Sequence, residues 1–232
     1  MKAHARLTAC FDGSRTVLRE LRSMAPLTLF PRRGGRGPTA VVHLVNSATS
    51  PLGGDDLLLS VHVGPGASLR LSGVAATLAL PGLHGEGSLS TVDIVVAEGG
   101  SLEYLPEPTV ITARARHTAV FRAAVASDAY LHTREVLVLG RAGESPGSLT
   151  TSLSVTRGAV PVLRQTLSIG DSTLDTSLAV LAGRRVLVSD LVVGGPELPA
   201  ASGEWWSRSP LAAGGTLTTS LAPDAVTALK PF

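Results

Sequence analysis

The sequence predicts a mainly β protein, built from stacked antiparallel hairpins or as a β-helix-like or sandwich architecture, with one or two short helices. Apolar residues alternate with small or polar ones along most of the chain, which is the pattern of half-buried strands. Gly and Pro number 25 and 15 in 232 residues and occupy most of the gaps between alternating segments. Since aromatic residues make up only 3%, the core must be built from Val, Leu, Ile and Ala.

The predicted strands run almost from the first residue to residue 221. Residues 3–10 alternate and stop at Asp12-Gly13, and residues 16–24 follow at hairpin distance. The further strands predicted by the same pattern cover residues 40–45, 57–63, 67–74, 89–97, 110–113, 119–125, 129–139, 149–156, 160–169, 176–181, 186–193 and 216–221.

Two segments favour a helix. Residues 222–229 carry Pro223 near the first helical position and Asp224 in the first turn, both of which are typical of helix starts. Residues 73–80 are rich in Ala but short, and their pattern fits a helix or a strand.

A strand–turn–strand unit recurs along the first half of the chain. Residues 61–69 reappear loosely as residues 94–102, and more faintly as residues 125–131, at offsets of 33 and 29 residues. Recurrence of this kind indicates a solenoid-like stack. Chance similarity between Val-rich hairpins is the alternative interpretation.

Composition limits the class of protein. The length favours a single domain over residues 1–232. A net charge of +2 with 16% charged residues does not call for a nucleic-acid partner, and 44% hydrophobic residues exclude global disorder. No segment approaches the roughly 20 apolar residues of a membrane span. No secretory signal is readable, so we expect a cytoplasmic protein.

Catalytic and metal-binding motifs are weak. Ser172, in Gly170-Asp171-Ser172-Thr173-Leu174, resembles the start of GDSL hydrolases, but no histidine follows it in the chain, so we interpret the match as chance. The six histidines are scattered, which argues against a tight structural metal site. The Arg-rich segment 31–38 is interpreted as a solvated loop, and Trp205-Trp206 as a core plug or a partner anchor.

Two carboxylates stand out. Asp55 follows two glycines at the start of a predicted strand, where it either closes a turn or faces inward. Glu135 interrupts an apolar strand, so its side chain must face solvent or a wet interior.

Five short motifs occur in a recognisable order: Gly53-Gly54-Asp55 before a strand, Val63-Gly64-Pro65-Gly66-Ala67, Ala75-Ala76-Thr77, Leu102-Glu103-Tyr104-Leu105-Pro106, and Leu139-Gly140-Arg141-Ala142-Gly143-Glu144. From about residue 6 to residue 145 the chain resembles the urease accessory proteins of the UreD/UreH type. It departs from them at Leu78, where a lysine is usual, and at Gln165, where an acidic residue is usual.

The resemblance implies a urease maturation scaffold rather than an enzyme. Its expected partners are the apo-urease subunits, a helical UreF-type accessory protein and, through it, a UreG-type GTPase, with no nucleic acid and no membrane. It implies no tightly bound cofactor but a transient nickel path, in which Asp55 and Glu135 are the candidate metal residues and Thr77 lines the path.

Isolated oxygen ligands suit such a path because a transported ion must be able to leave. The alternative is an all-β protein–protein interaction module with no metal role.

Overall fold

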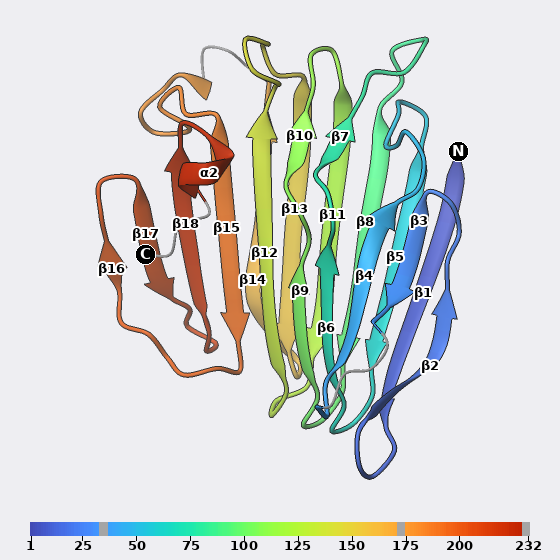
Figure 1. Cartoon of the computed structure of the whole chain (residues 1–232). Helices are drawn as coiled ribbons and strands as arrows, with labels where there is room; N and C mark the ends of the chain where they lie inside the picture. The colour runs from blue at the N-terminus through green and yellow to red at the C-terminus, as the bar shows by residue number, and fades with distance from the viewer. Residues whose placement is uncertain (33–36, 171–174, 229–232) are drawn as a thin grey trace.

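The computed structural model describes residues 1–32, 37–170 and 175–228, and their strands form two sheets that lie one behind the other (Figure 1). The strand at 160–169 and the strand at 16–22 are the two edges of the first sheet. In spatial order, the seven strands of this sheet are β14 (Val160–Ile169), β13 (Ser148–Arg157), β11 (Arg116–Val125), β8 (Ser88–Val96), β5 (Asp56–Val63), β1 (Lys2–Phe11) and β2 (Thr16–Arg22).

The second sheet is larger and carries a short branch. Its main order is β16 (Ala201–Ser202), β17 (Trp206–Pro210), β18 (Thr216–Ala222), β15 (Val186–Val193), β12 (Tyr130–Leu139), β9 (Ser101–Leu105), β6 (Ser68–Gly73), β4 (Ala40–Asn46) and β3 (Leu27–Pro31). The branch is β10 (Thr109–Ile111), which pairs with β12 and with β7 (Thr77–Ala79).

The chain winds between the sheets as a β-solenoid. From β5 to β13 it alternates between the first and second sheets, and each new strand pairs in parallel with the strand one turn earlier. The β-helix-like form of the predicted architecture is therefore the one adopted here, and antiparallel hairpins such as β1–β2 and β13–β14 flank it.

The offsets of the sequence repeat match the residue separations between paired strands of successive turns. Arg70 of β6 contacts Glu103 of β9, 33 residues further on, and Ser88 of β8 contacts His117 of β11 at a separation of 29 residues. These separations equal the two offsets found in the sequence, so the recurrence reflects the turns of the solenoid.

Equivalent residues of successive turns stack into apolar ladders between the sheets. Leu69, Leu102 and Leu131 are register partners on the second sheet and are all nearly or fully buried. Ile94, Ala123 and Val155 form the corresponding ladder on the first sheet. Branched and small aliphatic side chains thus fill the interior, as the low aromatic content requires.

Several sequence-based expectations change in detail. Residues 176–181 were expected to form a strand, but this segment consists of turns and bends. Its alternation is overridden because the segment has no neighbouring strand to pair with among the described residues. Residues 73–80 provide the end of β6 and all of β7, so they are extended and not helical.

The C-terminal helix is found where it was expected. Helix α2 (Ala225–Ala228) is preceded by Asp224, whose carboxylate accepts a hydrogen bond from the Thr227 backbone N–H at 2.8 Å. Ala228 packs with Val136, Val186 and Val188 on the outer face of the second sheet. Leu229, residues 33–36 of the Arg-rich segment and Ser172 lie outside the described residues.

The two tryptophans are half-buried rather than a core plug. The Arg184 guanidinium lies 3.8 Å from the ring centre of Trp205, and that of Arg208 lies 5.9 Å from the ring centre of Trp206. Both rings are therefore used as platforms for cations at the surface.

Truncating a ladder residue should unfold the stack more easily. We expect Leu102→Ala to lower the free energy of unfolding by about 2–5 kcal/mol, because it removes a fully buried side chain between two neighbouring turns. Leu83→Ala is the matched control, since Leu83 is 96% exposed and should change stability by less than about 0.5 kcal/mol. Equal denaturation midpoints in urea for the two variants would contradict the ladder.

Candidate functional site

A break in the second sheet lies beside the Glu135 side chain. Strand β12 pairs with β9 through residues 130–133 and with β10 through residues 137–139. Between them, Pro106-Glu107-Pro108 separates β9 from β10, and residues 134–136 of β12 have no register partner on that side. Proline has no N–H to donate, which explains why the ladder stops here.

A cavity of about 190 Å³ lies between the sheets at this break. Its polar lining includes Glu135, Thr77, Thr109, Tyr104 and His117, which come from both sheets. Its apolar lining includes Leu57, Leu59, Val92, Leu137, Leu153 and Leu191. Glu107 also lines it and has an exposed side chain, so the cavity reaches the surface at the break.

Glu135 points into this cavity because of strand alternation. Thr133 and Leu137, its neighbours on the same face of β12, are buried between the sheets. The Thr151 hydroxyl on the opposite sheet donates a hydrogen bond of 2.9 Å to the Glu135 carboxylate. Burial raises the pKa of Glu135 above its ordinary value, and this one hydrogen bond offsets only part of the effect. The site therefore favours a proton or another cation on this carboxylate.

Thr77 lies in the same cavity as Glu135. It begins β7, pairs with Thr109 of β10, and its backbone N–H bonds to the Pro108 carbonyl at 2.9 Å. The structure thus brings together two of the three residues that the sequence singled out for the nickel path.

Asp55 lies in a different environment. Its side chain is 5% exposed, is not among the residues lining the cavity, and closes the turn before β5. It accepts hydrogen bonds from the Ser50 hydroxyl at 2.6 Å and the Leu52 N–H at 2.8 Å, and the Met1 amino group lies 2.7 Å away. Burial acts to raise the pKa of Asp55, but these contacts outweigh it, so the pKa lies below its ordinary value.

Two other positions singled out by the sequence are peripheral. Gln165 is exposed on the edge strand β14, and Leu78 is exposed on β7. No cluster of three or more His, Cys, Asp or Glu side chains suited to holding a metal occurs among the described residues.

Sequence reasoning missed His117 as a residue of this site. The predicted strand began at residue 119, whereas β11 begins at Arg116. Extending the alternation back by one period would have placed His117 on the inner face, beside Ala119. The histidine is 5% exposed, and burial lowers its pKa to about 4, so its ring is neutral at pH 7.

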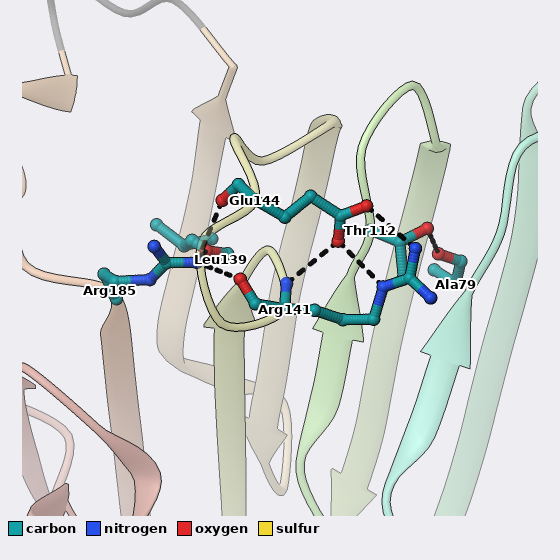
Figure 2. Close-up of polar contacts among 6 residues, drawn as sticks. All are labelled: Ala79, Thr112, Leu139, Arg141, Glu144 and Arg185. Carbon is teal, nitrogen blue, oxygen red and sulfur yellow. Dashed lines mark hydrogen bonds and ion pairs between the residues drawn. The ribbon is translucent and has the colours of Figure 1, made fainter.

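The last of the five motifs, residues 139–144, forms a cluster of hydrogen bonds with Arg185 (Figure 2). Arg141 Nε and Nη2 donate to Glu144 at 3.0 and 2.9 Å, and this pairing, together with the Arg141 N–H, lowers the pKa of Glu144 to about 2. Arg185 Nη2 donates to the carbonyls of Leu139, Arg141 and Glu144. Gly140 has a φ of 76°, and a Cβ there would lie 2.5 Å from the Glu144 carbonyl.

Comparison with known proteins places the chain among the urease accessory proteins. A family model described as UreD urease accessory protein matches residues 1–229. "Urease accessory protein UreD 1" of Saccharopolyspora erythraea is 55% identical over 232 residues, covering 98% of this chain and 91% of that protein. UreD of Parafrankia sp. is 41% identical over 97% of this chain and 84% of its own length. UreD of Streptomyces coelicolor is 39% identical, with 97% and 92% covered.

The chain belongs to the UreD family of urease accessory proteins. Membership gives it a role in urease maturation as an accessory protein. Within the described ranges, no helix has the length and apolar character needed to cross a bilayer.

The two carboxylates should affect stability with opposite pH dependence. The pKa of Asp55 is lowered on folding, so its contribution is present above about pH 3.8 and is lost as the pH falls further. We expect Asp55→Asn to cost about 1–3 kcal/mol at pH 7. Asp56→Asn is the adjacent control, because Asp56 makes only a surface pair with Lys2 at 3.9 Å. A neutral effect of Asp55→Asn in urea unfolding would refute this role.

For Glu135 the pH dependence of stability has the opposite sign. The unfolded chain releases the Glu135 proton near pH 4.5, whereas the folded chain holds it to higher pH, so stability decreases as the pH rises above that value. Glu135→Gln keeps an acceptor for Thr151 and removes the charge. We expect the variant to be more stable than the parent at pH 7 and equal to it at pH 4, as measured by urea unfolding at both pH values. A loss of stability at pH 7 would show that the charged form is satisfied in the fold.

Proposed function

We propose that this protein is a urease maturation scaffold that binds apo-urease and links it to a UreF-type helical protein and a UreG-type GTPase. Its cavity gives nickel a passage toward the urease active site. The observation that carries the proposal is the half-buried Glu135 carboxylate, which receives one hydrogen bond and lies in a cavity that reaches the surface at Glu107.

The chemistry of the cavity suits a transported divalent cation. Glu135 and the hydroxyl groups of Thr77 and Thr109 offer oxygen ligands from three different strands. Oxygen ligands of this kind bind nickel less strongly than a set of thiolates and imidazoles would, so the ion can move on. A cation entering the cavity also compensates the partly desolvated negative charge of Glu135, which favours entry without creating a permanent site.

Asp55 supports the proposal in a structural role. Its hydrogen bonds hold the turn between Ser50 and β5, and the flanking residues Pro51 and Leu57 both line the cavity. Asp55 thus shapes the wall of the passage, and nickel need not bind to it directly.

The test is urease activation in cells that express this chain with the urease subunits and the helical and GTPase accessory proteins. A tagged chain should co-purify with these partners. Glu135→Gln should leave the complex intact and lower the nickel content of urease about tenfold, because it removes the inner carboxylate. Glu98→Gln, a change at an exposed turn between β8 and β9, is the matched control and should activate urease normally.

The outcomes separate the proposal from its alternative. Normal nickel content with Glu135→Gln in an intact complex would leave an interaction module with no metal role. Failure of the parent chain to co-purify with any of the urease proteins would overturn the scaffold itself.

A further inference from the structure

A single histidine lines the cavity beside the oxygen ligands. His117 is the second residue of β11, on the inner face of the first sheet, and is 5% exposed. Its register partner on β8 is Ser88, whose side-chain oxygen lies 2.9 Å from His117 Nδ1. Adjacent turns of the solenoid therefore hold the imidazole in one orientation.

This contact leaves the other ring nitrogen available. In the described part of the chain, Nε2 of His117 has no hydrogen-bond partner. It is also not one of the buried side-chain atoms without a partner, so Nε2 keeps some accessible surface. The residue itself lines the cavity, on the inner face of the first sheet. Because the ring is neutral at pH 7, a metal ion need not displace a proton from it.

We propose that His117 is the residue that makes this cavity select nickel over magnesium and calcium, by offering Nε2 as a transient nitrogen ligand. The inference rests on the proposed nickel passage and adds its source of selectivity. It assigns Ser88 as the positioning residue that orients the ring.

Nickel differs from magnesium and calcium in the ligands that it prefers. Glu135, Thr77 and Tyr104 present oxygen atoms, which also suit Mg²⁺ and Ca²⁺. These ions are hard and gain little from imidazole, whereas Ni²⁺ binds imidazole well. One nitrogen ligand can therefore discriminate between the ions, and a single imidazole is too weak a site to trap nickel.

The direct test is nickel X-ray absorption of the purified full-length chain loaded with Ni²⁺. The parent protein should show the multiple-scattering features of one imidazole ligand, and His117→Gln should lose them while keeping oxygen coordination. Gln has a similar volume and can still bond to Ser88, so the fold is preserved; circular dichroism checks this. His62→Gln is the matched control, because His62 is exposed on β5. Imidazole features that persist in His117→Gln would overturn the proposal.

A second measurement covers selectivity and positioning. Nickel delivery to urease is titrated with Mg²⁺, and the concentration that halves delivery should fall about tenfold in His117→Gln and by a smaller factor in Ser88→Ala, which leaves the ring in place but unoriented. An unchanged Mg²⁺ sensitivity in His117→Gln would refute the selectivity role.

The controls distinguish this inference from the proposed function. If Glu135→Gln blocks nickel delivery while His117→Gln behaves as the parent does, the passage stands and the role of His117 fails. If Glu135→Gln has no effect on delivery, the passage itself fails, and the selectivity inference fails with it.

Discussion

The parallel backbone pairing between successive turns is the constraint on which the rest of this protein depends. Each turn lies in register with the turn 33 or 29 residues away, so equivalent side chains stack into continuous ladders. A shift of register by one residue would turn every inward side chain of a strand outward. Leu102 would then leave the core, and Glu135 would leave the cavity. The apolar ladders and the polar cavity are thus two results of the same backbone register.

The site arises where that pairing is interrupted. The Pro106-Glu107-Pro108 segment separates β9 from β10, and β12 runs past the gap as one long strand. The backbone pairing is missing beside Glu135, and the exposed Glu107 lies at the opening of the cavity. Gly73 is required beside this opening, because a Cβ there would lie 2.6 Å from the Glu107 nitrogen. Intact pairing above and below the gap keeps the opening in place.

The two carboxylates show how similar residues acquire different roles. Asp55 is surrounded by donors, so its charge is satisfied and it stabilises a turn. Glu135 receives one hydrogen bond between the two sheets, so its pKa is raised and its negative charge is costly. The first arrangement holds a fixed turn, and the second is the one on which the proposed passage depends. Isolated oxygen atoms, and not a closed metal cage, fit the nickel passage proposed above.

The sequence by itself determined the mainly β fold class, most strand positions and helix α2. Through its repeat it also determined the spacing between successive turns of the solenoid. These properties depend on local alternation, turn residues and recurrence. It also carried the motifs of the UreD family. Only the tertiary structure decided that 176–181 is not a strand, that Asp55 does not line the cavity, and that His117 does. Alternation says which residues share a face, but it does not say which strands face one another. The cavity combines side chains from Thr77 to Glu135 across two sheets, and that packing has no local signature.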